Sequence, residues 1–167
     1  MKTKKLVLCA LYSALTFIAT MVIQIKLSAN GFVNLGDCMV ITGGIFLGPI
    51  YGALSAAVGS VLADIVSGYI IYAPATLVIK SIMSIITALI YKRTKKYGFL
   101  SILICSVVSE LVMISGYFLY EIPLYGIGTA LSGMPGNLLQ STFAIAATSV
   151  LYKVLIKNNY IRNQLNF

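Results

Sequence analysis

Long apolar stretches alternate with short turn-rich segments along the chain. An α-helix rises 1.5 Å per residue, so about 20 apolar residues carry it across the hydrocarbon core of a bilayer. The turn signals between the stretches include Gly48-Pro49 and the glycine-rich segment 126–136. The pattern predicts six transmembrane helices, the second of them short, over residues 6–25, 37–47, 51–67, 75–91, 99–119 and 135–156.

Composition supports a membrane protein. The 167 residues are 59% apolar and only 10% charged, and the mean hydropathy is +0.97. An ordinary soluble domain has about 25% charged residues. The first apolar stretch follows a basic start and is longer than the core of a signal peptide, so we interpret it as a retained helix. We expect an all-α integral membrane protein with a single domain over residues 1–167.

The positions of the basic residues predict the orientation. Ten of the 12 lysines and arginines fall at the N-terminus, between the fourth and fifth predicted helices, or at the C-terminal end. With six helices these three places share one side, and the positive-inside rule makes that side cytoplasmic. Both termini are therefore expected in the cytoplasm. The net charge of +8 is attributed to contact with anionic membrane lipid rather than to nucleic acid. The ten residues are Lys2, Lys4, Lys5, Lys92, Arg93, Lys95, Lys96, Lys153, Lys157 and Arg162.

Several kinds of chemistry have no support in the sequence. The chain has no histidine, and Cys9, Cys38 and Cys105 are too far apart for a metal-binding pattern, so they are interpreted as packing residues. It has no Gly-Lys-Ser/Thr phosphate-binding loop, so ATP hydrolysis would have to come from partners. A membrane enzyme built on Asp64, Lys80 and Glu110 is a weaker alternative, because no paired-carboxylate motif accompanies them. We expect no enzymatic activity, no metal and no cofactor.

Polar residues inside the predicted helices suggest a binding site. The acids are Asp37, Asp64, Glu110 and Glu121, and counting along the helices places them with Lys80 in the outer half of the membrane. A charge at the bilayer centre costs at least about 2.5–3.5 kcal/mol, so such groups face the protein interior or a watery cavity. Their common level predicts a pocket open to the outside. Asp64 and Lys80 as a structural ion pair is the alternative interpretation.

Spacing along the helices places some of these groups on shared faces. Glu110 and Tyr117 are seven residues apart, and Asn137 and Gln140, three apart, open the last predicted helix. Aromatic side chains with a few amides and carboxylates suit a flat, hydrogen-bonding heterocycle. Tyrosines also act as anchors at membrane interfaces, and that alternative stays open. The tyrosines near the outer rim are Tyr69, Tyr72, Tyr117, Tyr120 and Tyr125.

Small residues recur at intervals that allow helices to approach closely in lipid. In the first helix Ala10 and Ala14 form an A-x-x-x-A face, which serves either internal packing or a partner subunit. In the second and third helices we interpret the pattern as tight internal packing; its members are Gly44, Gly48, Gly52, Ala56, Gly59 and Ala63.

Several motifs in order resemble the substrate-binding S components of energy-coupling factor (ECF) transporters. In the first half these are Asn34-Leu-Gly-Asp37, Leu47-Gly-Pro-Ile-Tyr-Gly52, Gly59-Ser-Val-Leu-Ala-Asp64, Gly68-Tyr69 and Tyr72-Ala-Pro-Ala-Thr76 with Lys80. In the second half they are Glu110, Gly116-Tyr-Phe118, Glu121 and Pro135-Gly-Asn137 with Gln140. The resemblance covers nearly the whole chain.

The resemblance implies a six-helix protein that binds a micronutrient at its outer face. It implies partners as well: one transmembrane coupling subunit and two ABC-type ATPases, with the coupling subunit meeting the face of Ala10 and Ala14. The most similar members are those for hydroxymethylpyrimidine or pyridoxine-type vitamers. Riboflavin, thiamine or folate remains an alternative ligand, and a self-sufficient small transporter remains an alternative function. The candidate substrate-binding residues are Asn34, Asp37, Tyr72, Lys80, Glu110, Tyr117, Asn137 and Gln140.

Overall fold

The computed structural model describes residues 2–22, 24–28 and 31–158. Within them, five helices are long and apolar enough to cross a membrane. These helices are α1 (Lys2–Val22), α2 (Gly36–Val66), α3 (Ala73–Thr94), α4 (Phe99–Tyr125) and α5 (Ile127–Leu155). Two short strands, β1 (Ile25–Ser28) and β2 (Gly31–Val33), pair as an antiparallel hairpin between α1 and α2. Short 3₁₀ turns, η1 (Ile70–Tyr72) and η2 (Lys95–Tyr97), precede α3 and α4.

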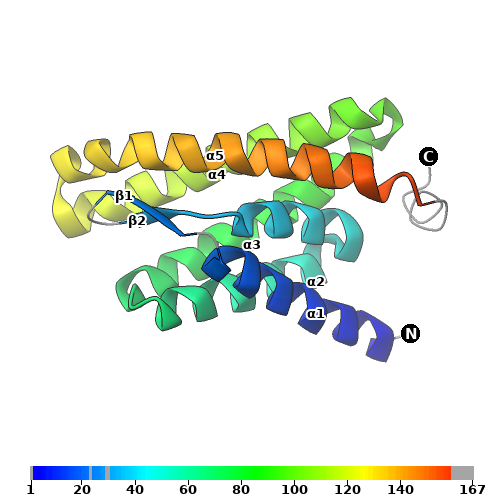
Figure 1. Ribbon diagram of the computed structural model, residues 1–167, viewed down its shortest axis with the longest axis horizontal. Helices are drawn as coiled ribbons and strands as arrows, with labels where there is room; N and C mark the ends of the chain where they lie inside the picture. The colour runs from blue at the N-terminus through cyan, green and yellow to red at the C-terminus, as the bar shows by residue number, and fades with distance from the viewer. Residues whose placement is uncertain (1, 23, 29–30, 159–167) are drawn as a thin grey trace.

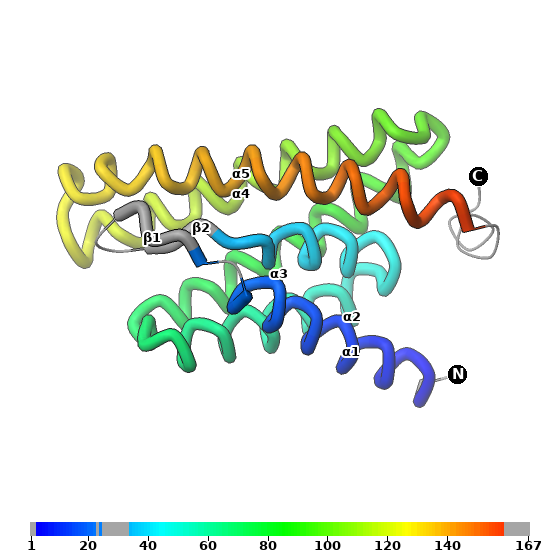
Figure 2. The backbone as a smooth tube through the Cα atoms, viewed as in Figure 1, coloured from blue at the N-terminus to red at the C-terminus, as the bar shows by residue number. Residues whose placement is uncertain are grey.

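The prediction of an all-helical membrane protein is confirmed, but the described residues form five long helices where the sequence predicted six. The second and third predicted helices together form α2, which is interrupted at Gly48. The chain reverses direction there: a Cβ on Gly52 would lie 2.9 Å from the Cα of Gly44. Residues eight apart in one straight helix are about 12 Å apart. The two limbs of α2, residues 36–47 and 49–66, therefore fold back on each other (Figure 2).

The sequence around Gly48 explains the reversal. Gly48 has φ 77° and ψ −177°, a conformation that is essentially confined to glycine. Pro49 follows, and its ring is accommodated at the first position of the second limb because no amide hydrogen is needed there. The Gly48-Pro49 turn signal in the sequence thus marks a real break in direction.

Replacing Gly48 with alanine is expected to destabilise the fold by about 1–3 kcal/mol, because a Cβ disfavours this backbone conformation. No atom lies within 4 Å of the position that the new Cβ would occupy, so the effect is conformational rather than a clash. The measurement is the melting temperature of the purified chain in detergent. Gly128→Ala is the matched control: its Cβ also meets nothing within 4 Å, but Gly128 lies in α5, where alanine is favourable. Equal melting temperatures for the two variants would contradict the prediction.

The small residues of α2 pack as the sequence predicts, with Gly48 as the exception. A Cβ on Gly44 would lie 2.5 Å from the backbone oxygen of Ser84 in α3. A Cβ on Gly59 would lie 2.4 Å from the backbone oxygen of Ser13 in α1. Glycine at these two positions therefore lets α2 approach α1 and α3 closely, as small residues do in membrane proteins.

The core and the outer surface are both apolar, as expected for a bundle in lipid. Met83, Ile102 and Met113 are fully buried, whereas Val22 and Ile50 are more than 70% exposed. Large apolar side chains on the outside would be unfavourable in water, but they match the hydrocarbon of a bilayer.

Three segments that carry the basic residues lie at the same end of the molecule. Figure 1 shows the start of α1, the connection from α3 to α4 and the end of α5 on the right of the view. The β1–β2 hairpin and the connection from α4 to α5 lie toward the opposite end (Figure 1). Arg162, which was counted with the basic C-terminal residues, lies outside the described residues. The structure therefore places at one end the three basic segments from which the sequence predicted a common membrane side.

The last helix begins earlier than predicted. α5 starts at Ile127 rather than at residue 135, and Pro135 lies within it. Asn137 and Gln140 are therefore in the interior of α5 and not at its start. The glycines and Pro135 of this segment suggested a break, but a proline is tolerated inside a membrane helix when neighbouring groups satisfy the freed backbone.

Candidate functional site

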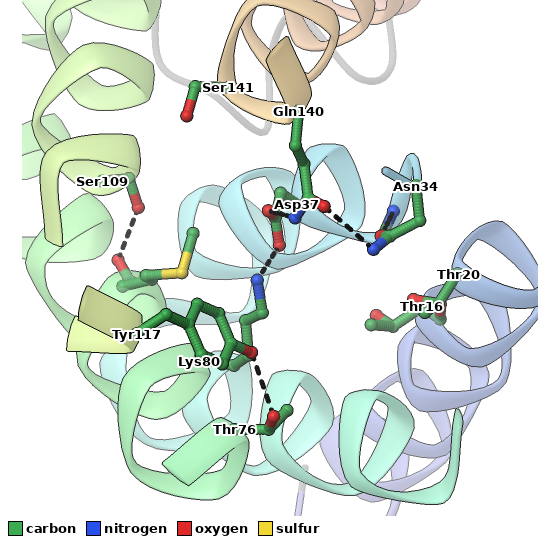
Figure 3. A network of polar contacts seen from close by, with 12 residues as sticks. Thr16, Thr20, Asn34, Asp37, Thr76, Lys80, Ser109, Tyr117, Gln140 and Ser141 are labelled. Carbon is green, nitrogen blue, oxygen red and sulfur yellow. Dashed lines mark hydrogen bonds and ion pairs between the residues drawn. The ribbon is translucent and has the colours of Figure 1, made fainter. Parts of the chain in front are cut away.

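The centre of the candidate site is a buried ion pair between α2 and α3. The ammonium of Lys80 donates to Oδ1 of Asp37, and the two side chains are 6% and 1% exposed. Asp37 lies in the first turn of α2, where the positive end of the helix dipole favours a carboxylate. Figure 3 shows the two side chains pointing toward each other in the interior. The alternative pairing of Lys80 with Asp64 is thus wrong, because Lys80 pairs with Asp37.

Two amides extend this pair into a chain of hydrogen bonds. Nε2 of Gln140 donates to Oδ2 of Asp37 at 2.6 Å, and Nδ2 of Asn34 donates to Oε1 of Gln140 at 3.2 Å (Figure 3). Oδ1 of Asn34 accepts the backbone N–H of Gly36 at 2.8 Å. The network therefore joins α3, α5 and the start of α2, directly after the β1–β2 hairpin.

Tyr117 adds an aromatic ring to the ion pair. The ammonium of Lys80 lies 5.4 Å from the centre of the Tyr117 ring, within the range of a cation–π contact. The Tyr117 hydroxyl is 2.9 Å from Oγ1 of Thr76, which lies one helical turn before Lys80 in α3 (Figure 3). The ring is thus oriented by two residues of α3.

A tyrosine cluster surrounds Tyr72, at the junction of η1 and α3. The hydroxyl of Tyr72 donates to Oε1 of Glu121 at 3.1 Å. The Tyr72 ring lies 6.0–6.5 Å, between centroids, from four other tyrosine rings. Those four tyrosines are Tyr69, Tyr117, Tyr120 and Tyr125. The rim tyrosines therefore pack together, and Tyr117 links their cluster to the ion pair.

Glu110 differs from the other carboxylates. It is 2% exposed, and neither of its oxygens has a hydrogen-bond partner among the described residues. Its electrostatic neighbours are Asp37 and Lys80, with the hydroxyl of Ser141 close by. The Ser141 hydroxyl donates at 2.8 Å to the backbone oxygen of Asn137. Glu110 thus lies beside the network without being part of it.

The structure brings most of the predicted residues together. Asn34, Asp37, Lys80 and Gln140 form one hydrogen-bonded chain, and Tyr117 contacts it. Tyr72 belongs to the tyrosine cluster instead. Asn137 is half-buried, one turn before Ser141 in α5, and no hydrogen bond of its side chain is described.

Three contributing residues were not among the predicted site residues. Thr76 and Ser141 provide hydroxyls beside Tyr117 and Glu110, and Glu121 accepts the Tyr72 hydroxyl. Helical spacing could have found two of them: Thr76 is four residues before Lys80, and Glu121 is four residues after Tyr117.

The A-x-x-x-A face of α1 points away from the bundle. Ala10 and Ala14 are exposed, and so are Val7, Leu11 and Ile18 on the same side of the helix. The side that packs against α2 instead carries residues such as Thr16, which a Cβ on Gly59 would contact. Internal packing within this chain therefore does not account for the two alanines.

Among the described residues, no group of three or more cysteine or acidic side chains is placed to hold a metal ion.

Similarity to known proteins covers the whole fold. One chain with a solved structure, described as the S component of a bacterial ECF transporter, matches with a TM-score of 0.69 at 20% identity over 100% of both chains. An uncharacterised protein of Pyrococcus woesei is 34% identical over 84% of this chain and 93% of its own length. The thiamine precursor transporter HmpT of Lactococcus lactis subsp. cremoris (strain MG1363) is 28% identical over 89% of this chain and 85% of its own length.

A protein-family model gives the assignment. The model described as the S component of ECF-type riboflavin transporters matches residues 1–157, which is nearly the entire chain. The fold, with its five apolar helices, agrees with that match. The chain belongs to the family of ECF transporter S components.

Proposed function

We propose that this chain captures a small heterocyclic vitamin or vitamin precursor and delivers it to an ECF-type importer. A hydroxymethylpyrimidine or a pyridoxine-type vitamer is the favoured ligand. The observation that carries the proposal is the buried polar network of Asn34, Asp37, Lys80 and Gln140 beside Tyr117 and the unpartnered Glu110. The similarity to a thiamine precursor transporter supports a pyrimidine ligand, whereas the family description supports riboflavin as the competitor.

The chain is proposed to hold both termini in the cytoplasm, with the two limbs of α2 acting as separate membrane segments. The reversal at Gly48 and the common end of the three basic segments support this topology. Single cysteines at Lys96 and Gly126 test it. A membrane-impermeant thiol reagent added to whole cells should label only the second.

The delivery step is proposed to require partners. The chain would dock on a transmembrane coupling subunit with two ABC-type ATPases, because it carries no phosphate-binding loop of its own in its 167 residues. The ligand would enter at the end that holds the β1–β2 hairpin, opposite the basic segments.

Uptake of labelled ligand tests the proposal. Cells that express the chain with a coupling subunit and its ATPases are expected to accumulate labelled hydroxymethylpyrimidine or pyridoxine, and cells that express the chain alone are not. The purified chain should also be stabilised by the same ligand, since binding to the native state adds RT ln(1 + [L]/Kd) to its stability. Accumulation by the chain alone would favour a self-sufficient transporter. Exclusive stabilisation by riboflavin would replace the favoured ligand.

A further inference from the structure

Glu110 is the one carboxylate among the described residues with both oxygens buried and unpartnered. Asp37 accepts from Lys80 and Gln140, Glu121 accepts from Tyr72, and Asp64 has one buried oxygen without a partner. Glu110 is nevertheless 2% exposed and lies near the middle of α4. A buried carboxylate without partners is strongly unfavourable, so its presence calls for a partner that arrives from outside the chain.

The neighbouring groups are already engaged. The Lys80 ammonium is bound to Asp37, both ends of the Gln140 amide are used, and the Ser141 hydroxyl donates to a backbone oxygen. The hydrogen-bonding capacity left at Glu110 is therefore a pair of oxygens side by side. A pair of parallel N–H donors matches such a carboxylate.

We infer, on the basis of the proposed function, that Glu110 binds the amidine edge of the ligand, a ring nitrogen next to an amino group as in a 4-aminopyrimidine. The amino group donates one hydrogen bond, and the second runs between the ring nitrogen and the other carboxylate oxygen through one shared proton. That proton comes from the protonated ring, so Glu110 binds as a carboxylate and the ring as a cation. Tyr117, on the same face of α4, supplies an aromatic ring near the bound heterocycle.

This chemistry discriminates between vitamin classes. A flavin presents an imide edge, in which one N–H lies between two carbonyl oxygens, and these oxygens would face the Glu110 carboxylate. A phosphorylated ligand would bring a further negative charge toward it. The arrangement therefore selects an unphosphorylated aminopyrimidine-type ligand, even though the family model is described by riboflavin.

Two matched probes test the inference on the purified full chain. They are 4-amino-5-hydroxymethyl-2-methylpyrimidine and its 4-oxo counterpart, and calorimetry measures the affinity of each. The unchanged chain is expected to bind the amino probe at least about tenfold more tightly, because only that probe forms two charge-assisted hydrogen bonds with Glu110. In Glu110→Gln, the side-chain amide pairs with either edge after flipping, so the two affinities should converge to within about threefold.

Controls separate this result from a general disturbance. Asp64→Asn makes the same carboxylate-to-amide change at another buried position and should retain the tenfold preference. Glu110→Asp keeps a carboxylate and should retain the preference at reduced affinity. Melting temperatures without ligand identify any variant that has not folded.

Two outcomes would overturn the inference. One is an unchanged preference in folded Glu110→Gln. The other is a chain that binds pyridoxine or riboflavin, and transports it with the coupling subunit and ATPases, but binds neither pyrimidine. The second outcome leaves the proposed function standing, whereas the absence of any transported ligand removes both.

Discussion

Replacing Lys80 with methionine is expected to destabilise the folded chain by about 3–5 kcal/mol. Methionine fills a similar volume, but it leaves the Asp37 carboxylate, 1% exposed, without its counter-charge. Among the described residues, Gln140 then remains as the side-chain donor to that carboxylate. Removing one partner of a buried pair costs far more than the pair contributes, because the remaining charge stays desolvated. The measurement is unfolding of the purified chain in detergent.

A double variant gives this prediction its control. In Asp37→Leu with Lys80→Met, both members of the ion pair are removed, so the double variant should be more stable than Lys80→Met alone. Lys157→Met, at an exposed position, should change stability by less than about 0.5 kcal/mol. A Lys80→Met chain as stable as the Lys157→Met chain would mean that the ion pair does not hold α2 against α3.

Replacing Ala14 with tryptophan is expected to reduce uptake by at least about tenfold while leaving ligand binding unchanged. Ala14 and Ala10 are exposed and do not face α2, so a large side chain there is accommodated in the isolated chain. Close helix contacts in lipid depend on small residues, and an indole ring would hold a docking helix away. A loss of about 1.4 kcal/mol in docking corresponds to the tenfold effect.

Two measurements on each variant separate docking from folding: uptake in cells that contain the coupling subunit and ATPases, and thermal stabilisation by ligand in the purified chain. Val107→Trp is the matched control, since Val107 is 45% exposed on α4 and outside the alanine face. Full uptake by Ala14→Trp would show that the partner meets a different surface. Loss of ligand binding would show that the alanine has an internal role.

The sequence predicted the membrane class and most of the helices correctly because hydropathy directly reflects the solvent of each segment. It also placed a break at Gly48-Pro49, where the backbone needs a conformation that glycine provides. It misplaced the start of α5, because glycine and proline favour turns in water but are tolerated in membrane helices.

The sequence predicted most residues of the candidate site, but not which of these residues bind one another. Lys80 is 16 residues from Asp64 and 43 from Asp37, and neither separation determines which carboxylate lies closer in the bundle. That choice depends on how α2 folds back at Gly48, which brings its first turn to the interior. Whether Glu110 has a hydrogen-bond partner depends on how the side chains of four helices pack around it, and spacing along one helix does not reveal that.

The reversal at Gly48 has a consequence for how the chain fits its bilayer. The first limb of α2 has 12 residues, from Gly36 to Leu47, and spans roughly 18 Å at 1.5 Å per residue. The hydrocarbon core of a typical bilayer is about 30 Å thick. No residue of this limb is exposed, so the surrounding helices rather than lipid cover most of it, and a limb shorter than the bilayer is tolerated. Its first turn, with Asp37, therefore meets α3 at Lys80, about two turns inside that helix, rather than at the helix end.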